Sequence, residues 1–405
     1  MAKRILPLVL VLLFLWACRS NSPENSEEIQ SLKNYLVENP EMIAGLNHSI
    51  SKEESELAGK LIHEYLDEKL RTDFRDQWEN ETLLLDDYQL KFSYKKFGKK
   101  PETGWTLYIS MHGGGNAPVE VNDQQWENQK KLYEPAEGIY MAPRAPTNTW
   151  NLWHQPHIDE FFSRYLQLAD VFEDINTNRV YLTGYSAGGD GTYQLAPRMA
   201  DQLAAAAMMA GHPNDASPLG LRNLPFAIHM GAEDGAYNRN KIAAEWGLML
   251  DSLQQADPEG YIHDVEIHEG MGHWMEKKDT AAIYWMAQCS RRPYPEKVVW
   301  FQSGVTHDRF YWLAVPAGKG KKDSEIKASI KGQTITIEKA ELVNNLIIRL
   351  NDKMMDLDKK VKVVYSGKIV YNDTPDRTVS TVWKTLNERN DPEQFFCSEI
   401  ELTLN

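Results

Sequence analysis

Cysteine is scarce in this sequence, which has three cysteines in 405 residues. Cys18 lies near the start, so only Cys289 and Cys397 remain for the body of the chain. A chain of this length buries enough apolar surface to fold without disulfides, so we expect two buried thiols, with a disulfide between them as the alternative. The sequence also lacks Cys-x-x-Cys, His-Glu-x-x-His and clustered carboxylate loops. It therefore predicts no metal site and no cofactor.

Positive charge is in deficit, with 44 Lys and Arg against 58 Asp and Glu and a formal net charge of −14. A surface of this sign repels polyanions. We therefore expect no nucleic-acid partner.

Long apolar runs are lacking apart from Ile5–Trp16, which follows Lys3-Arg4. This run is too short to predict a membrane span and is typical of a signal peptide. The sequence Leu15-Trp16-Ala17-Cys18 resembles a bacterial lipobox, although Trp16 is atypical there. The resemblance implies that Cys18 is lipidated and anchors the protein in the cell envelope, periplasmic or at the outer-membrane surface. Plain secretion with an incidental cysteine is the alternative.

The sequence Gly184-Tyr185-Ser186-Ala187-Gly188 follows the apolar run Val180–Leu182 and precedes a helix-like stretch. A serine hydroxyl becomes an effective nucleophile when a base is within reach, and a nearby amide N–H stabilises the charge that develops. A tight strand-to-helix turn flanked by glycines meets both conditions. The pattern predicts that Ser186 is a nucleophile, but alone it also occurs by chance.

A second element stands upstream, where His112-Gly113-Gly114-Gly115 follows the apolar run Thr106–Met111. Glycines at the end of a buried strand leave backbone N–H groups free to face a substrate oxygen. We predict that the amides of Gly113 and Gly114, with that of Ala187, form an oxyanion hole. A flexible glycine turn is the alternative.

An acid is expected after the next strand, because the chain order of this type of site is serine, acid, histidine. The run Leu224–Gly231 is strand-like, and the loop Ala232-Glu233-Asp234-Gly235 follows it. We predict that Asp234 is the acid, with Glu233 as the alternative.

The base is expected on a loop after a further strand. Val265–His268 is a short strand, and Gly272-His273-Trp274 follows it. We predict that His273 takes the proton of Ser186 while Asp234 holds the imidazole tautomer. Four other histidines downstream of the serine compete for this role: His212, His229, His263 and His268.

Residues from about Leu90 to Ala287, roughly half of the chain, resemble the α/β-hydrolase superfamily, nearest to its polyhydroxybutyrate-depolymerase-like and related esterase branches. The motifs that carry the resemblance are Tyr108–Gly114, Gly184–Gly189, Gly231–Asp234 and Gly272–Trp274. The pair Gly188-Gly189 is also similar to prolyl-oligopeptidase-like peptidases. The sequence before the hydrolase segment has no propeller-like repeat, and the His-Gly-Gly-Gly element is more typical of esterases. Asp190 is unusual at its position.

Two flanking regions have other patterns. Residues from Asn25 to about Thr82 have helical spacing, with a helix stop at Asn39-Pro40 and a capping box of Ser51 and Glu54. We expect these helices to pack on the hydrolase body as a stabilising extension. A lid or a spacer from the membrane is the alternative. Beyond Pro293, short β-rich runs alone predict a β-sandwich of roughly immunoglobulin size.

Four ring side chains lie on loops after strand-like runs, between the glycine loop and the serine: Trp126, Trp150, Trp153 and His154. Their position near the expected sheet edge makes them candidate substrate-binding residues, although tryptophan is as common in a core. Aromatic walls suit sugars, aryl acyl groups or polyester chains.

The sequence thus predicts an α/β-hydrolase fold, a mostly parallel sheet flanked by helices, with an N-terminal helical extension and a C-terminal β-sandwich domain. The expected boundaries are residues 1–18 for the lipoprotein signal peptide, 19–85 for a polar tether and the helical extension, 86–293 for the catalytic domain and 296–405 for the β-sandwich. The expected function is hydrolysis of carboxylic esters, small or polymeric, through a Ser-His-Asp triad and an acyl-enzyme. A prolyl-oligopeptidase-like peptidase is the second reading, and a non-catalytic surface binding lipoprotein is the third.

Overall fold

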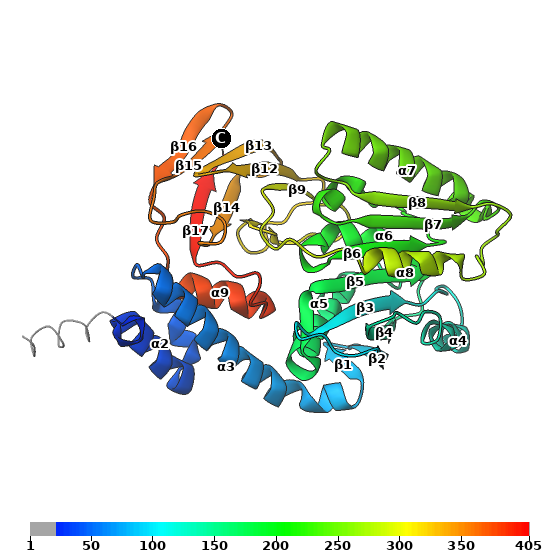
Figure 1. The fold of residues 1–405 in the computed structure, drawn as a ribbon, viewed down its shortest axis with the longest axis horizontal. Helices are drawn as coiled ribbons and strands as arrows, with labels where there is room; N and C mark the ends of the chain where they lie inside the picture. The colour runs from blue at the N-terminus through cyan, green and yellow to red at the C-terminus, as the bar shows by residue number, and fades with distance from the viewer. Residues whose placement is uncertain (1–21, 405) are drawn as a thin grey trace, which may run out of the picture. The chain divides into compact units, whose positions relative to one another are not determined.

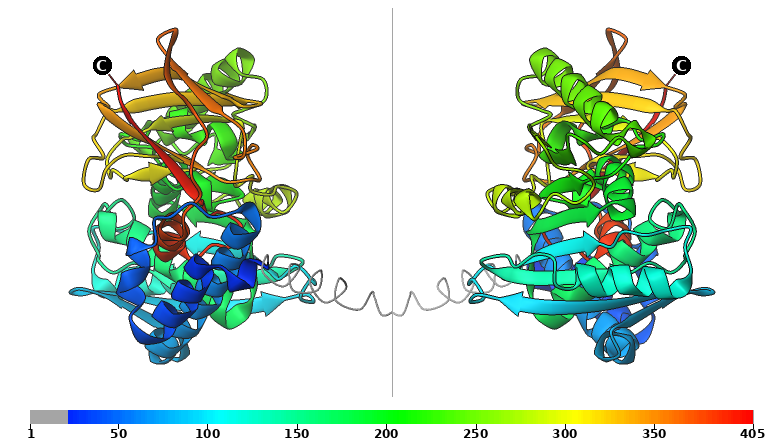
Figure 2. Two further views of the ribbon diagram at one scale, coloured as in Figure 1. Left: turned by 90° about the vertical axis from the view of Figure 1, so that its left-hand side faces the viewer. Right: turned by 90° about the vertical axis from the view of Figure 1, so that its right-hand side faces the viewer.

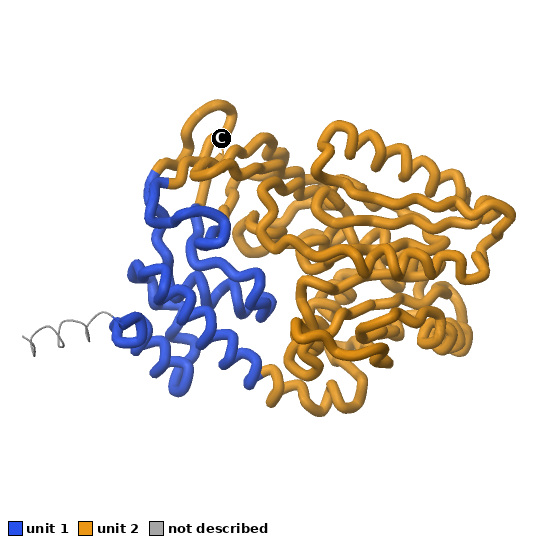
Figure 3. The backbone as a smooth tube through the Cα atoms, in the orientation of Figure 1, with its two compact units in different colours: residues 1–69, 349–360, 373–400 blue, residues 70–348, 361–372, 401–405 orange. Residues whose placement is uncertain are grey.

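The computed structural model describes residues 22–404, so the predicted signal peptide and Cys18 lie outside the described residues. The chain forms two compact units, coloured separately in Figure 3. The larger unit comprises residues 70–348, 361–372 and those after 400, and the smaller comprises residues up to 69 with 349–360 and 373–400. The smaller unit therefore combines N-terminal residues with two segments of the predicted β-sandwich domain.

The larger unit contains an eight-stranded sheet with the order β1-β2-β4-β3-β5-β6-β7-β8 (Figure 1). Its strands are β1 Thr82–Leu85, β2 Tyr88–Phe97, β3 Trp105–Met111, β4 Gly138–Arg144, β5 Ile175–Tyr185, β6 Ala205–Met209, β7 Phe226–Gly231 and β8 His263–His268. The hairpin of β1 and β2 is antiparallel, as is the pairing of β2 with β4. Every other neighbouring pair is parallel. Parallel strands bring their carboxyl ends to one edge, where the loops that follow them meet.

Helices cover both faces of this sheet (Figures 1 and 2). Their bounds are α4 Val119–Gln129, α5 Pro156–Glu173, α6 Ala187–Arg198, α7 Arg239–Ala256 and α8 Ala281–Met286. Contacts join α5 to α6 through Arg198 and Asp159, and α6 to α7 through the rings of Tyr193 and Trp246. On the other face, one apolar cluster contains residues of α8 and is packed by Trp126 of α4. A sheet covered on both sides explains why β6 is buried throughout its length.

The predicted strand-rich region forms two further sheets, with the orders β10-β11-β14-β17 and β16-β15-β13-β12-β9. Their strands are β9 Lys297–Phe301, β10 Arg309–Phe310, β11 Leu313–Ala314, β12 Glu325–Lys331, β13 Thr334–Glu341, β14 Asn345–Leu350, β15 Val361–Tyr365, β16 Lys368–Asp373 and β17 Ser398–Thr403. The expectation of strands alone was wrong, because helix α9, Val379–Arg389, lies between β16 and β17. The side chain of Thr378 accepts a hydrogen bond from the amide of Thr381 and caps this helix.

In the smaller unit, helix α2, Glu27–Glu38, is followed by α3, Lys52–Glu79, of which residues up to 69 belong here. The predicted capping box is present, because Ser51 and Glu54 each accept a hydrogen bond from the other's amide. These helices pack with α9: the Ser380 amide donates to the Leu46 carbonyl, and the ring of Tyr65 lies 6.0 Å from that of Trp383.

The last turns of the helical extension pack on the hydrolase body, as expected. The end of α3 belongs to the larger unit, where Trp78 stacks on Phe172 of α5 at a centroid distance of 5.4 Å. Within the smaller unit, the earlier residues pack against α9.

Three further features concern the described residues. Cys289 and Cys397 are both free thiols, and Cys397 is buried. Within residues 22–404, no helix is both long and apolar enough to span a membrane. No group of three or more His, Cys, Asp or Glu side chains suited to a metal ion is found in the same range.

Candidate active site

Ser186 occupies the turn between β5, which ends at Tyr185, and α6, which begins at Ala187. Its backbone has φ 57° and ψ −117°, a conformation that costs a non-glycine residue about 1–3 kcal/mol. The flanking glycines make this turn possible. A Cβ at Gly184 would lie 2.1 Å from the Gly188 carbonyl oxygen, and a Cβ at Gly188 would lie 2.1 Å from that of Met111. Side chains at either position would force the elbow open.

The structure brings Ser186, His273 and Asp234 into one hydrogen-bonded chain. The Oγ of Ser186 lies 2.9 Å from Nε2 of His273, and Nδ1 of the same imidazole lies 2.7 Å from Oδ2 of Asp234. Because a carboxylate only accepts hydrogen bonds, Nδ1 carries the proton, which leaves Nε2 able to accept the serine proton. The three residues come from the loops after β5, β7 and β8, which end at the same edge of the sheet.

The acid loop distinguishes its two carboxylates by burial. Asp234 is 4% exposed and faces His273, whereas Glu233 is exposed. The guanidinium of Arg239 lies 3.9 Å from the second oxygen of Asp234. The structure therefore places Asp234, and not the alternative Glu233, against the imidazole.

The loop that carries His273 is tied to the elbow by Tyr185. The phenol oxygen donates to the carbonyl of His273 over 2.7 Å and accepts from the amide of Met275 over 3.1 Å. The residue before the serine thus holds the backbone on both sides of Trp274.

The four competing histidines make other hydrogen bonds. The ring of His229 is fully buried and lies 3.0 Å from that of His268, and burial lowers the pKa of His229 to about 3. His263 lies 3.1 Å from the carboxylate of Asp251. The Nδ1 of His212 accepts the amide of Asn214.

The predicted oxyanion loop lies against the serine, since a Cβ at Gly113 would be 3.1 Å from the Cβ of Ser186. Ala187 is the first residue of α6, and the first amides of a helix have no intrahelical acceptor. Gly114, with φ 106°, and Ala187 both line a pocket together with Ser186. The three amides predicted as donors therefore belong to residues beside the serine.

His112 determines how this loop is turned. Its fully buried Nδ1 lies 2.6 Å from the Gly113 carbonyl oxygen, and its Nε2 accepts the Ala145 amide over 3.1 Å. A carbonyl oxygen only accepts, so the ring is neutral with its proton on Nδ1; burial lowers its pKa to about 3. In a trans peptide, C=O and N–H point in opposite directions, so the Gly114 N–H points away from His112.

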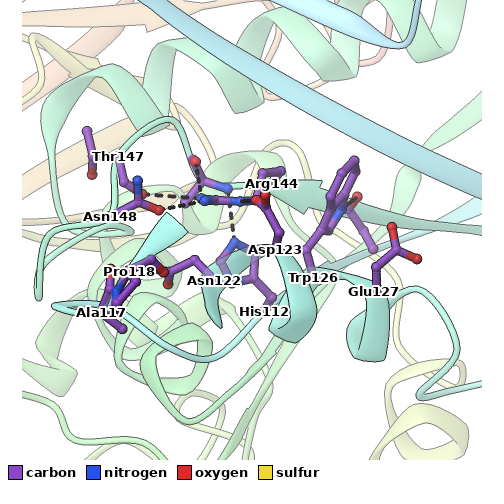
Figure 4. A network of polar contacts seen from close by, with 12 residues as sticks. His112, Ala117, Pro118, Asn122, Asp123, Trp126, Glu127, Arg144, Thr147 and Asn148 are labelled. Carbon is purple, nitrogen blue, oxygen red and sulfur yellow. Dashed lines mark hydrogen bonds and ion pairs between the residues drawn. The ribbon is translucent and has the colours of Figure 1, made fainter. Parts of the chain in front are cut away.

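Asn122 supports the same loop, and Arg144 holds the neighbouring loop after β4 (Figure 4). The buried Asn122 accepts the Gly115 amide at 2.8 Å and donates to the carbonyl oxygens of Ala117 and Pro118. Arg144 donates to Asp123 and to the side chain of Asn148. Asn122 was not predicted from the sequence, because its role depends on α4 turning back against the glycine loop.

A pocket of about 310 Å³ opens beside Ser186. Of the four predicted aromatic and imidazole candidates, Trp150 lines it. Trp153 does not, because it is fully buried and donates its indole N–H to the carbonyl of His112. Trp126 instead donates to the carbonyl of Ala142 under the ammonium of Lys130. The prediction of these two tryptophans as substrate walls was wrong, since neither lines the pocket: Trp153 lies in the core, and Trp126 is partly buried against the apolar cluster.

His154, the fourth candidate, stands behind Trp150, with its ring edge-on at a centroid distance of 5.4 Å. Burial lowers its pKa to about 4. It therefore supports the ring of Trp150 and is not part of the pocket lining.

The pocket also contains residues that sequence reasoning missed, including Asp190, Tyr237 and Arg239. Asp190 is partly buried and accepts a hydrogen bond from the amide of His212 over 2.6 Å, and desolvation raises its pKa. The available signal for Tyr237 was an aromatic residue just after the acid loop, at the edge where the other site residues meet.

No protein-family model matches this chain. A bifunctional acetylxylan esterase/xylanase of Neocallimastix patriciarum is 29% identical over 147 residues, which cover 34% of this chain and 20% of that protein, so the chain spans about a fifth of that relative. Among solved structures, a thermostable esterase has a TM-score of 0.39 at 17% identity, covering 52% of this chain and 62% of its own. A feruloyl esterase module from Clostridium thermocellum has a TM-score of 0.36 at 15% identity, covering 52% and 86%.

Features of this chain itself identify its fold. The antiparallel hairpin of β1 and β2 lies at one side of a parallel sheet. The serine stands on a strained turn between β5 and α6. The acid and the histidine follow on the loops after β7 and β8, in the expected chain order. These features are those of an α/β-hydrolase fold.

Proposed function

We propose that this protein is a serine hydrolase that cleaves carboxylic esters. The observation that carries the proposal is the chain of hydrogen bonds from Ser186 through His273 to Asp234, at 2.9 and 2.7 Å. Such a chain activates an alcohol that is otherwise a poor nucleophile.

In the proposed reaction, Nε2 of His273 takes the Ser186 proton as Oγ forms a bond with the acyl carbon. Asp234 stabilises the resulting imidazolium. The bond from the acyl carbon to the alcohol oxygen then breaks, and His273 gives the proton to that oxygen. A water repeats the two steps on the acyl-enzyme and releases the acid.

The negative charge of each tetrahedral intermediate would lie on the former carbonyl oxygen. The amides of Gly113, Gly114 and Ala187 are the proposed donors to it. Because His112 and Asn122 hold the loop before the substrate arrives, little reorganisation is required at the moment of reaction.

An ester is favoured over a peptide as the substrate by the His-Gly-Gly-Gly element, and by the likeness over 147 residues to a protein described as an acetylxylan esterase/xylanase. Matched acyl nitrophenyl esters and peptide nitroanilides test this choice. A higher kcat/KM on the anilides would make the peptidase the correct reading.

A fluorophosphonate probe tests whether the protein is an enzyme at all. The wild-type chain should be labelled at Ser186 and Ser186→Ala should not, whereas Ser163→Ala, which removes a serine on α5 outside the pocket, should be labelled like the wild type. An unlabelled wild-type protein that also leaves short acyl esters intact would favour a binding protein on a hydrolase scaffold.

We also propose that the protein is anchored in the bacterial cell envelope by lipid on Cys18. The support is the sequence alone: Lys3-Arg4, the apolar run Ile5–Trp16 and the small residue before Cys18. Stable anchoring requires more than one acyl chain. Metabolic labelling with an alkyne fatty acid should mark the wild-type protein but not Cys18→Ala, and labelling of both would contradict the proposal.

A further inference from the structure

The pocket beside Ser186 combines two exposed aromatic rings with a polar lining. Trp150 is 59% exposed and Tyr237 is 75% exposed, although both line the pocket. Large apolar rings left in water at the mouth of a cavity are an unfavourable arrangement unless a ligand covers them. The pocket volume of about 310 Å³ is at the lower end of the range for small-molecule sites and is large enough for a single ring.

The backbone around Tyr237 is held in a strained form. Tyr237 has φ 55° and ψ 21°, and Asn238 has φ 57°, so two consecutive non-glycine residues adopt the left-handed region. Residues with this geometry cluster at functional sites, because the fold must compensate their strain. Here the strained turn displays an aromatic side chain, whose exposed position gives no compensating burial in the core.

Both rings are held by a neighbouring side chain. The ring of Trp150 is supported edge-on by His154, and the guanidinium of Arg239 lies 4.9 Å from the ring centre of Tyr237. Held rings lose less conformational entropy when a ligand stacks on them.

The polar lining of the pocket contains groups that can form hydrogen bonds with a ligand. The buried Nε of Arg239 has no hydrogen-bond partner among the described residues, and its Nη1 lies 3.9 Å from Asp234, beyond hydrogen-bond distance. The side chain of Asn116 and the carboxylate of Asp190 also line the pocket. An apolar ring seated here would remove water from these groups without offering them a hydrogen-bond partner, which is costly.

A sugar ring satisfies both kinds of surface, because its C–H faces stack on aromatic rings and its hydroxyl groups donate and accept hydrogen bonds. We infer that Trp150 and Tyr237 hold a sugar ring of the substrate, so that the protein cleaves esters carried by carbohydrates. The inference rests on the proposed esterase function and names its substrate class. Aryl and alkyl esters match the rings but not the polar lining.

The test compares esters of equal ring size with and without hydroxyl groups. The sugar esters are an acetylated methyl xyloside and the methyl ester of a methyl glucuronoside, which place the sugar on either side of the scissile bond. Their matched controls are cyclohexyl acetate and methyl cyclohexanecarboxylate, with methyl ferulate as the aryl ester and ethyl acetate as the reference. At least one sugar ester should exceed its cyclohexyl control in kcat/KM on the order of 10- to 100-fold, because unpaired polar groups penalise the analogue.

Variants then assign the preference to the two rings. Trp150→Ala and Tyr237→Ala should each lower the ratio of sugar-ester to ethyl-acetate kcat/KM on the order of 10-fold, mainly through KM, and Tyr237→Phe should retain it. Tyr284→Ala removes an aromatic that is 53% exposed on α8 and outside the pocket, and should behave like the wild type. Thermal unfolding of each variant checks that it is folded.

Two outcomes would overturn the inference while leaving the esterase function intact. The first is a kcat/KM for methyl ferulate or for the cyclohexyl esters that equals or exceeds the kcat/KM for the sugar esters. The second is a ratio of sugar-ester to ethyl-acetate kcat/KM that is unchanged in both ring variants. Cleavage of none of the esters, with no fluorophosphonate labelling, would instead refute the proposed function. In that case, calorimetric titration of the wild-type protein with a xylo-oligosaccharide still decides the sugar site, since binding lost in Trp150→Ala supports it and absence of binding refutes it.

Discussion

The imidazole of His112 and the carbonyl of Gly113 are joined by a 2.6 Å hydrogen bond inside the protein, although the two residues are neighbours in the chain. This bond turns the next amide, that of Gly114, away from the imidazole. A buried neutral histidine is therefore a positioning residue for the proposed oxyanion hole.

Replacement of His112 by Asn should lower kcat by about 100-fold with a smaller change in KM, because misdirecting one oxyanion donor removes an interaction made mainly in the transition state. Steady-state kinetics with a short acyl ester measure this. The control is His229→Asn, which alters another fully buried histidine of the same unit and should reduce stability more than kcat. Equal kcat losses in both variants would contradict a positioning role.

The two carboxylates of the acid loop should differ sharply in their effect. Asp234→Asn should reduce kcat by about 10,000-fold, because the amide no longer holds the imidazole in the tautomer that accepts the serine proton. Glu233→Gln, which changes an exposed neighbour, should stay within about twofold of the wild type, as surface substitutions usually do. A large loss in Glu233→Gln alone would reassign the acid.

The base is tested by a pair of histidine variants. His273→Ala should lower kcat by about a million-fold, since loss of one triad member disables the unit. His268→Ala should retain most of the activity, because its ring is hydrogen-bonded to His229 and not to the serine. A large loss of kcat in His268→Ala, with activity retained in His273→Ala, would identify His268 as the base.

The free energy of unfolding should fall as the pH is lowered below about 6.5. Burial holds the pKa of His112 and of His229 at about 3 in the folded protein, whereas an exposed histidine has a pKa of about 6.5. Between these values only the unfolded chain takes up the proton, so each residue should contribute a slope of up to about 1.4 kcal/mol per pH unit. Urea unfolding at several pH values measures it, and a slope unchanged in His229→Gln would contradict this account.

A partly buried ion pair should add stability that is lost at a still lower pH. Arg222 donates two hydrogen bonds to Asp257, at 2.8 and 2.9 Å, and these bonds lower the pKa of the carboxyl to about 2. The stabilisation is complete above the unfolded pKa of about 3.9 and is lost as the pH falls toward 2. Asp257→Asn should therefore cost about 1–3 kcal/mol at pH 7, with a difference that shrinks below pH 4. An unchanged difference at pH 3 would refute it.

The positions of the site residues were accessible from the sequence because their signals are local. A strand followed by a glycine-flanked serine predicts a tight turn from backbone sterics alone, and the Cβ positions at Gly184 and Gly188 show why no other residue fits. The acid and the base were found by the same rule, a polar residue on the loop after a strand.

The errors concern residues whose surroundings come from distant parts of the chain. Trp126 and Trp153 follow strand-like runs just as Trp150 does, but their indole N–H groups find carbonyl partners on other elements. The helix α9 was missed among short strands because its apolar face is defined by packing with the N-terminal helices. Burial of a ring depends on what packs over it, which periodicity does not reveal.

The amino-acid sequence alone determined the class of fold, the nucleophile and the loops that offer candidates for the acid and the base, because backbone sterics and strand-loop alternation are encoded over a few neighbouring residues. The tertiary structure decided which histidine meets the serine and which carboxylate meets that histidine. It also decided which way the Gly114 amide points and that Tyr237 shares a pocket with Trp150. These relationships join residues on separate loops, and only the packing of the sheet and its helices sets the distances between them.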